Sequence, residues 1–357
     1  MCKDGFPKLF LSFLMAMVLS GCSAATPDVR VLWPPPPQTP KMEFIGAYYS
    51  EAHLHDTKRG RMVSSMLGDD QALAFDFPFG IASNSKDLVY VTDSGGKRIY
   101  VVDFNRKKIT ELGKSPVGSP MGITIDDGGR IYVVVPETKN VLVYSDNHTP
   151  MFNFGSEVLK KPSKIAIDEN RKRIYVSDLG DNSVKSFDFE GKHLFSFGEP
   201  GSDVGKLWKP TGLVVDEEGN IYVAEGLNAR ISVFDSAGKH LKSFGERMNN
   251  VGGFEIPKDI AMDSEGNLHI LDTRKAGILT YSKEGELLLY TGFGKPTNNA
   301  LGFGSPTSIF IDARDRIFVA DMLNKRFSVW QFMNETYLKE NPVTESERQA
   351  YRNVEAR

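Results

Sequence analysis

Cysteine is scarce in this sequence. Of its 357 residues only Cys2 and Cys22 are cysteines, so no thiol follows residue 22. The bulk of the chain therefore lacks the means to form a disulfide, a thiolate zinc site, an iron–sulfur cluster or a C-x-x-C-H haem attachment. A domain without such links is stabilised by its core alone, which requires a large and regular core.

An excess of charge of one sign and long apolar runs are also lacking. The formal net charge is −3 and the pI is near 6.1. No basic segment is long enough to follow a phosphate backbone, so nucleic acid is disfavoured as a partner. The apolar run from Leu9 to Val18, which follows Lys3 and Lys8, is too short to span a bilayer permanently. Residues 1–21 are therefore predicted to be an export signal.

The end of this signal, Leu19-Ser20-Gly21-Cys22, resembles the lipobox of bacterial lipoproteins. The resemblance implies cleavage before Cys22 and acylation of its thiol with chains such as palmitate, each buried methylene adding about 0.8 kcal/mol to membrane binding. Ser23, by the same resemblance, favours the outer membrane, facing the periplasm. The alternative is a plain signal peptide with a chance cysteine. Residues 22–40 include Pro34 to Pro37 and are predicted to form an extended, Pro-rich tether.

The sequence from residue 77 to 332 repeats itself six times. The repeats are anchored by prolines whose spacings, by subtraction, are 42, 42, 48, 47 and 49 residues: Pro78, Pro120, Pro162, Pro210, Pro257 and Pro306. Such a period is typical of one propeller blade per repeat. Within one unit, four short strand-like segments are separated by turns such as DEEG and DSAG. The first segments are continuously apolar and the later ones alternate, which indicates an order from inner to outer strand.

The unit at 209–245 reads KPTGLVVDEEGNIYVAEGLNARISVFDSAGKHLKSFG and resembles the NHL repeat. The resemblance covers residues 77–332 and implies an all-β fold, a six-bladed β-propeller of four-stranded blades, in which the blades bury their faces against one another. Two departures are visible. Val135 replaces the acid that ends the second strand of blade 2, and the last unit lacks its fourth strand.

The segment KMEFIGAYYS (41–50) alternates like the fourth strand of a blade. We therefore predict that it supplies the outer strand of blade 6 and closes the ring, which removes an open sheet edge. Residues 51–76 form an insertion before blade 1. Residues 333–357 are predicted to be a polar, helical C-terminal tail, with Thr344 and Glu347 as a capping box.

Acids recur at the end of the second strand in five of the six repeats, and an arginine opens the third strand in some of them. An enzyme needs a distinctive residue at one place, so a repeated acid is interpreted as a structural device that accepts backbone N–H bonds and sometimes pairs with the arginine. These residues are Asp93, Arg98, Asp178, Glu225, Arg230, Asp272, Asp321 and Arg326. Asp126, Asp168, Asp216, Asp263 and Asp312 recur in the first turn and are likewise predicted to form turns.

Enzymes of the lactonase type and the amidating-lyase type, which resemble this architecture, hold a metal at the axial mouth through Glu, Asn, Asp or His side chains from several blades. The six histidines here are scattered: His53 and His55 in the insertion, His148 in an outer turn, His193 and His240 on outer strands, and His269 in place of a core tyrosine. No nucleophile motif such as G-x-S-x-G is present. We therefore predict no catalytic residue, no metal and no cofactor.

The residues that do not repeat lie in the loops that lead into the blades and in the turns between second and third strands, which we expect on one face of the ring. Their mixture of apolar, polar and charged side chains favours a binding surface over a metal cage. The alternative is a plain solvated rim. The candidate residues of this face are Phe79, Met121, Lys164, Asp181, Thr211, Leu227, Asn228, Lys258, Asp259, Arg274, Ser308, Met322 and Asn324.

The sequence thus favours a membrane-tethered, non-catalytic propeller. We expect it to be a monomer and to bind an envelope protein, peptide or glycan through this loop face. The alternative function is a metal-dependent lyase or hydrolase at the axial mouth. RNA binding, as in some animal NHL proteins, conflicts with export and with the acidic balance.

Overall fold

The computed structural model describes residues 29–55, 74–113, 118–250 and 252–355. The predicted export signal, Cys22 and most of the insertion 51–76 lie outside these residues. The chain divides into two compact units. Unit 1 contains residues up to Ile45 and from Trp330 onward, and unit 2 runs from Gly46 to Val329. Within the described residues no helix is both long and apolar enough to cross a membrane.

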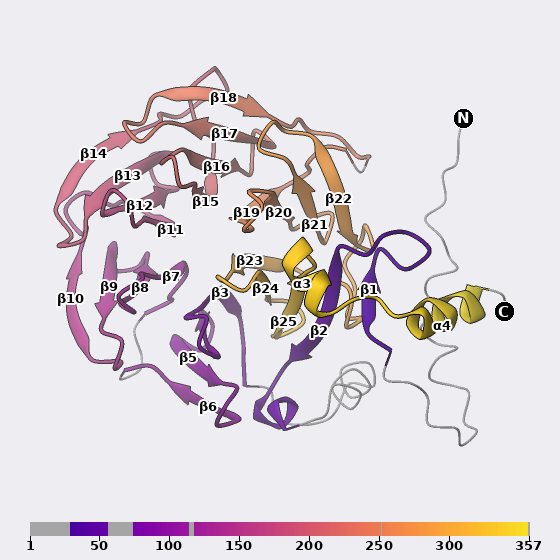
Figure 1. Ribbon diagram of the computed structural model, residues 1–357. Helices are drawn as coiled ribbons and strands as arrows, with labels where there is room; N and C mark the ends of the chain where they lie inside the picture. Colours follow the sequence, from indigo (N-terminus) through magenta and orange to yellow (C-terminus); the bar gives the residue numbers. More distant parts are fainter. Residues whose placement is uncertain (1–28, 56–73, 114–117, 251, 356–357) are drawn as a thin grey trace. The chain divides into compact units, whose positions relative to one another are not determined.

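Six sheets surround a common centre, and this confirms the predicted six-bladed β-propeller (Figure 1). Blade 1 consists of β3 (Pro78–Ser83), β4 (Leu88–Asp93), β5 (Arg98–Asp103) and β6 (Lys108–Glu111). Blade 2 consists of β7 (Ile123–Ile125), β8 (Ile131–Val135), β9 (Asn140–Tyr144) and β10 (Pro150–Phe154). Blade 3 consists of β11 (Pro162–Asp168), β12 (Arg173–Asp178), β13 (Ser183–Asp188) and β14 (His193–Phe197).

The remaining blades follow the same antiparallel order. Blade 4 consists of β15 (Pro210–Val215), β16 (Ile221–Glu225), β17 (Arg230–Phe234) and β18 (His240–Phe244). Blade 5 consists of β19 (Pro257–Met262), β20 (Leu268–Asp272), β21 (Gly277–Tyr281) and β22 (Leu287–Gly292). Blade 6 contains β23 (Pro306–Ile311), β24 (Arg316–Asp321) and β25 (Arg326–Phe332). Its sheet order, β1-β2-β25-β24-β23, confirms that the segment 41–50 supplies the next strand, β2 (Met42–Tyr48).

The turn between the second and third strands has the same backbone in every blade. The residue before the third strand has a positive φ in all six, although none of them is glycine: Lys97, Lys139, Asn182, Ala229, Ala276 and Lys325. For an alanine such as Ala229 (φ +52°) this conformation is unfavourable in isolation. The hairpin therefore imposes the positive φ on this residue. Because all six blades repeat this conformation, the turn is a structural feature of the fold.

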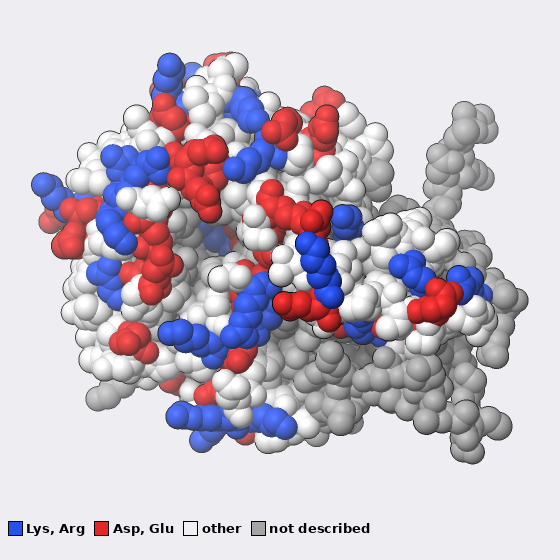
Figure 2. Space-filling view, viewed as in Figure 1, with Lys and Arg blue, Asp and Glu red and all other residues white. Residues whose placement is uncertain are grey.

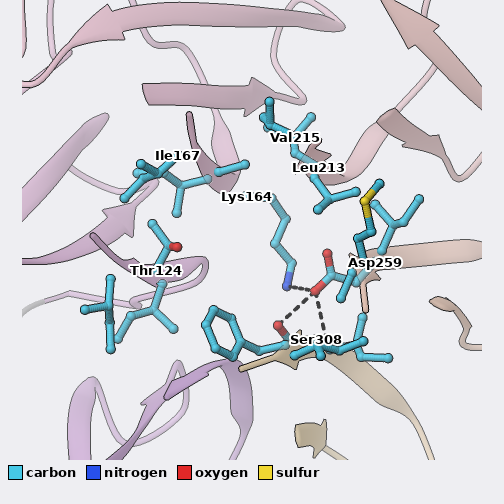
Figure 3. Close-up of a pocket in the computed structure, with 18 of the residues that line it drawn as sticks. Thr124, Lys164, Ile167, Leu213, Val215, Asp259 and Ser308 are labelled. Carbon is cyan, nitrogen blue, oxygen red and sulfur yellow. Dashed lines mark hydrogen bonds and ion pairs between the residues drawn. The ribbon is translucent and has the colours of Figure 1, made fainter. Parts of the chain in front are cut away.

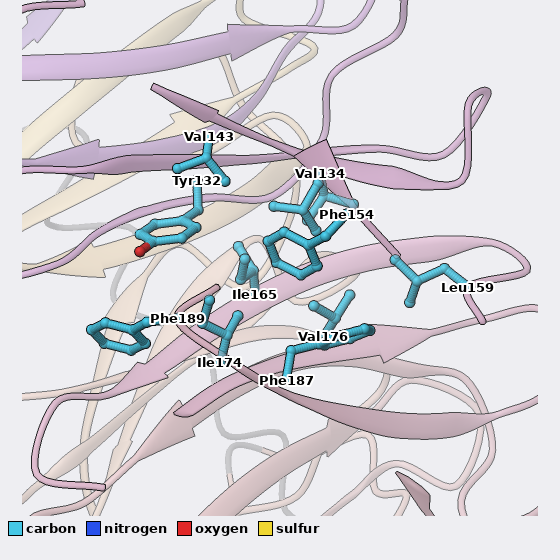
Figure 4. Close-up of a cluster of buried hydrophobic side chains, with 11 residues drawn as sticks. Tyr132, Val134, Val143, Phe154, Leu159, Ile165, Ile174, Val176, Phe187 and Phe189 are labelled. Carbon is cyan, nitrogen blue, oxygen red and sulfur yellow. The ribbon is translucent and has the colours of Figure 1, made fainter. Parts of the chain in front are cut away.

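The core of the ring lies between neighbouring blades. One cluster joins blades 2 and 3: Tyr132, Val134, Val143 and Phe154 pack against Ile165, Ile174, Val176 and Phe187 (Figure 4). Each sheet thus covers the face of the next, because the continuously apolar inner strands are buried on both sides. At about 25 cal/mol per Å² of apolar surface, this inter-blade burial is the main stabilising term in a domain without crosslinks.

Unit 1 differs from the predicted tether. Residues 31–33 form a strand, β1 (Val31–Trp33), which pairs antiparallel with β2 in the register Val31↔Phe44. Pro34 to Pro37 lie in the connection between these two strands and include two cis peptide bonds. The segment from residue 31 onward is therefore part of the folded structure and not an extended spacer, because the sheet satisfies the backbone groups that a spacer would leave to water.

The C-terminal tail forms two helices, α3 (Glu335–Glu340) and α4 (Glu345–Glu355). The predicted capping box is confirmed: the Thr344 amide donates to the Glu347 carboxylate at 2.8 Å, and the Glu347 amide donates to Thr344 Oγ1 at 3.2 Å. Arg30 Nε donates to the same carboxylate at 2.7 Å. The tail is not only polar, since Tyr351 is buried against Leu32 and donates through its hydroxyl to the Arg30 carbonyl at 2.8 Å.

Candidate functional site

The blade prolines and the turns after the second strands lie on one face of the ring. Pro210 lies opposite Glu225 in the strand register, and Pro162 lies opposite Asp178. The same pairing is found in blades 1, 5 and 6. The loops that lead into the blades therefore meet the second turns at this edge of each sheet. We call the surface they form the proline face.

The acid that ends each of these second strands is fully buried and links the two loops of its blade. Glu225 accepts hydrogen bonds from the backbone amide of Trp208 at 2.9 Å and from Arg230 Nε at 2.7 Å. Asp178 accepts from the amides of Lys160 and Lys161 at 2.6 and 2.8 Å. Asp93, Asp272 and Asp321 accept amides of the preceding loop in the same way. The lone pairs are therefore used by the fold, and a substrate would have to displace backbone donors.

The cations beside these acids differ from blade to blade. Arg230 bonds the acid of its own blade directly, and the fully buried Arg326 lies 3.6 Å from its acid while donating to two carbonyl groups. Arg98 instead pairs with Glu111 at 2.7 Å on a half-exposed surface. In blade 3 the buried Lys185 provides the positive charge, 3.2 Å from the acid. The repeat does not reveal Lys185, because it lies on a different position of the third strand.

The axial channel is lined by the six first strands, and the second residue after each proline decides how closely they approach. At this level Gly80, Gly122 and Gly212 face the backbone of the next blade: a Cβ on Gly212 would lie 2.6 Å from the Cα of Asp259. The other three blades with side chains at this level provide Lys164, Asp259 and Ser308. The glycines therefore hold neighbouring blades together, and the polar residues extend into the channel.

A single buried ion pair bridges the channel between blades 3 and 5. Lys164 Nζ lies 2.5 Å from Asp259 Oδ2, and both side chains are at least nine-tenths buried. The same oxygen accepts Ser308 Oγ at 2.9 Å and the amide of Ile309 at 3.0 Å (Figure 3). Burial lowers the pKa of the Lys164 ammonium, while the charge of Asp259 opposes this shift. Three donors on one carboxylate oxygen fix the bridge in place.

Aliphatic side chains form most of the remaining channel wall. The cavity holds about 200 Å³ and is lined on every side by residues such as Ile123, Ile167, Leu213, Val215 and Met262. Within the described part of the chain, no three His, Cys, Asp or Glu side chains gather closely enough to hold a metal ion. What the channel offers to a ligand is therefore a largely aliphatic wall, the internally paired Lys164 and Asp259, and the acids Asp127 and Glu169.

The histidines form local contacts with the fold. His269 is fully buried, with Nε2 2.8 Å from Asp263 Oδ2 and Nδ1 3.1 Å from Thr280 Oγ1. At the equivalent place in blades 2 and 4, Tyr132 and Tyr222 donate their hydroxyls to the first-turn acids. His269 therefore replaces a tyrosine hydroxyl. His193 and His240 contact serines of their own outer strands, His148 contacts Tyr90, His53 contacts Ser50, and His55 is exposed.

The candidate residues of the loop face occupy three kinds of position. Lys164, Asp259 and Ser308 form the channel bridge, and Phe79 and Thr211 are buried beside it. Asn228 and Asn324 are used by the fold: each amide donates to the acid of its blade, at 2.5 and 2.6 Å. Arg274 pairs with Glu255, and Asp181 with Lys185. Among the described residues, the candidates whose side chains form no such bond are Leu227, which is exposed, and Met121, Lys258 and Met322, which are half-buried. Arg274 also keeps an exposed side chain despite its pair.

The proline face carries exposed apolar residues of which, apart from Leu227, none was among the residues predicted for it. Ten large hydrophobic residues of the described chain are exposed, and six of them belong to this face: Phe77, Val204, Trp208, Leu227, Ile256 and Leu323. The other four lie on outer strands: Met151, Leu194, Leu241 and Leu288. A signal was present, because three of the missed residues stand one or two positions before a blade proline, where a solvated loop favours polar residues.

Two of these apolar residues, Trp208 and Leu227, are neighbours, and a third, Phe77, lies beside a lysine. The amide of Leu227 donates to the Trp208 carbonyl at 3.4 Å, which places these residues side by side. Phe77 lies under the ammonium of Lys325, 6.0 Å from its ring centroid, and Lys325 also pairs with Asp76 at 2.9 Å. The charged side chains do not separate by sign: acidic and basic residues intermingle across the face drawn in Figure 2.

No protein-family model and no curated protein matches this chain. Among solved structures it is similar to a streptogramin B lyase, with 14% identity over 73% of this chain and 95% of that one and a TM-score of 0.57. It is also similar to the nidogen/laminin complex, with 17% identity over 66% of this chain and 86% of that one and a TM-score of 0.54. A third similar structure is a gluconolactonase from Xanthomonas campestris, with 16% identity over 75% of this chain and 92% of that one and a TM-score of 0.57. At such identities the similarity shows the fold alone, a six-bladed β-propeller shared by enzymes and binding proteins.

Proposed function

We propose that this chain is a lipid-anchored, non-catalytic NHL-type propeller of the bacterial cell envelope, which binds a protein or peptide through its proline face. The observation that carries the proposal is the gathering of exposed apolar side chains on that face. Trp208 is 47% exposed, Leu227 46% and Leu323 65%. Six of the ten exposed large apolar residues of the described chain belong to this face, and Trp208 and Leu227 are adjacent on it. Exposed apolar surface of this kind is characteristic of interaction sites, since it is otherwise a liability for a folded domain.

The chemistry of this face suits a protein partner better than a glycan. Tryptophan and other large apolar residues are the usual anchors of protein interfaces, where a few of them supply most of the affinity. The polar groups nearby, such as Asn228 and Glu225, are bonded within the fold. They therefore offer few of the free, convergent hydrogen-bond partners that a sugar ring needs.

The anchor in this proposal is Cys22, supported by the lipobox resemblance. It would hold the propeller at the membrane, with the outer membrane facing the periplasm as the proposed location and a monomer as the proposed state. We expect metabolic labelling with a palmitate analogue to mark the wild-type chain and not Cys22→Ser. Labelling of both, or membrane retention of the unlabelled variant, would contradict the anchor.

Photo-crosslinking in intact cells tests the binding face. A photoreactive residue at Leu227 should capture a specific protein, whereas the same residue at Leu194 should not. Leu194 is the matched control, because it is 42% exposed against 46% for Leu227 but lies on an outer strand. Equal capture at both positions, or recovery of glycan alone, would overturn the proposal.

The alternative, a metal-dependent lyase or hydrolase at the channel mouth, has no specific observation in its favour. Asp259, the acid at this level of the channel, already accepts three hydrogen bonds. Stoichiometric divalent metal retained after dialysis, together with a loss of thermal stability on chelation, would nevertheless restore it over the binding proposal.

A further inference from the structure

An ammonium group without a charged partner lies at the proline-face end of the axial channel. Lys258 is the first residue after the blade 5 proline and is half-buried. Its Nζ lies 5.1 Å from the centroid of the Phe79 ring, across the channel on blade 1. Among the described residues it forms neither an ion pair nor a hydrogen bond. A lysine usually keeps its ammonium in water, so a half-buried, unpaired one is unusual.

The neighbouring carboxylate does not neutralise Lys258. Asp259 Oδ2 is taken by Lys164, Ser308 and the Ile309 amide, so its charge is already paired with Lys164. The charged groups that act on Lys258 are Lys164 and Lys209, which repel its charge, and Asp259, which attracts it. Burial, followed by the repulsion of Lys164 and Lys209, lowers the pKa of Lys258 to about 8, and the attraction of Asp259 opposes this shift only in part. The group is therefore still largely protonated at pH 7, in surroundings that favour an added negative charge.

The charge left to balance indicates the kind of anion. Lys164 is already paired with Asp259, and Lys209 is exposed to solvent. The partly buried charge that remains is the single positive charge of Lys258, which one monoanion balances. A phosphate, with nearly two negative charges, would also face the carboxylate of Asp259 and lacks the arginine fork that phosphate sites commonly use. The Phe79 ring beside the ammonium favours hydrocarbon next to the anionic group.

We propose that Lys258 and Phe79 form a binding site for a carboxylate with an apolar neighbour, and that this carboxylate belongs to the ligand of the proline face. This proposal rests on the proposed function, since it identifies the chemistry by which that face holds its ligand. A peptide C-terminus with a large apolar side chain and a small apolar organic acid share this chemistry. In both cases the carboxylate pairs with Nζ of Lys258 and the apolar group packs on Phe79.

The test compares an acid with its amide on the purified full chain. N-acetyl-Leu-Leu with a free carboxylate is the peptide probe, its C-terminal amide is the matched control, and hexanoate represents the small acids. Binding is followed by NMR of chains carrying ¹³C-labelled lysine, with the Lys258 signal assigned by its absence in Lys258→Met. We expect the peptide acid to shift this signal saturably, to raise the Lys258 titration midpoint, and to bind at least tenfold more tightly than the amide.

Variants separate charge from shape. Lys258→Met should weaken binding of the peptide acid at least tenfold, and Lys258→Arg should retain most of it, because the positive charge is kept. Lys239→Met, which removes an exposed lysine from the outer turn of blade 4, should leave it unchanged. Tighter binding of hexanoate than of the peptide acid would assign the site to small acids. Equal binding of acid and amide, or tighter binding of inorganic phosphate than of either acid, would overturn the carboxylate site.

The two proposals fail separately. Capture of a protein at Leu227, with no response of Lys258 to either acid, leaves the binding face and removes the carboxylate site. A response of Lys258 to the acid, without capture of a protein at Leu227, keeps the carboxylate site and removes the proposed protein partner.

Discussion

The ion pair across the axial channel gives the sharpest prediction about stability. Lys164 and Asp259 are buried and directly paired, so removing one partner leaves the other uncompensated. Such a loss typically costs about 3–5 kcal/mol, because it leaves an uncompensated buried charge. We expect Lys164→Met and Asp259→Asn each to lower the free energy of unfolding by about 3 kcal/mol at pH 7. The double variant should lose about the same amount as one single variant, which gives a coupling energy of about 3 kcal/mol.

The pH dependence of Asp259→Asn follows from the pKa of Lys164. Burial already lowers this pKa and Asp259 opposes the shift, so the variant should lower it further. Between the lowered folded pKa and the unfolded value of about 10.4, the unfolded chain binds more protons, and stability therefore rises with pH. The free energy of unfolding of the variant should therefore approach that of the wild type as the pH rises from 7 toward 10. The difference should shrink by at most about 1.4 kcal/mol per pH unit.

Urea unfolding of the purified full chain measures both effects. Circular dichroism and tryptophan fluorescence should give coincident transitions, which tests the two-state assumption behind the coupling energy. The exposed pair Lys172 and Glu169, 3.0 Å apart, is the control and should couple by less than about 1 kcal/mol. A coupling between Lys164 and Asp259 below about 0.5 kcal/mol, or a deficit that grows with pH, would refute the buried bridge.

Three further predictions concern other parts of the fold. His269→Tyr should leave the urea midpoint nearly unchanged, because a tyrosine hydroxyl donates to the equivalent acid in other blades. His269→Phe should lower the free energy of unfolding by about 1–3 kcal/mol, because Asp263 loses a hydrogen-bond donor. Equal losses of stability in both variants would contradict this. Glu225→Gln should cost about 3 kcal/mol in the same assay, since Arg230 and a backbone amide lose their charged acceptor, and a change below about 0.5 kcal/mol would show that the acid is not structural. Arg30 holds the pKa of Glu347 at about 2, below its unfolded value of about 4.3. The stabilisation of α4 by this ion pair is therefore complete above about pH 4.3 and is lost as the pH falls toward 2. Hydrogen-exchange protection of α4 should fall over that range in the wild type and be low and nearly constant in Arg30→Met; the same decline in both would exclude the ion pair as its cause.

The sequence alone determined the architecture of the ring. A period of about 45 residues, apolar inner segments and alternating outer ones predict blades because each strand pattern is local and six copies reinforce one another. The closing strand was also predictable, since the last unit lacks its fourth strand and only the segment 41–50 alternates as a substitute. For the same reason the repeated acids, such as Glu225, could be separated from catalytic candidates by comparison among the repeats.

The tertiary structure alone decided what the non-repeating residues do. Lys164 and Asp259 are 95 residues apart, and only the closed ring brings them together across its axis. Likewise, β1 was mistaken for part of a tether because the proline run Pro34 to Pro37 separates it from its partner β2, and because the C-terminal tail that packs on it is distant in sequence. Leu227 and Leu213 are both leucines, but one is exposed and the other buried. Local patterns fix strands and turns because their hydrogen bonds are local, whereas exposure and charge pairing are fixed only when six sheets close around one axis.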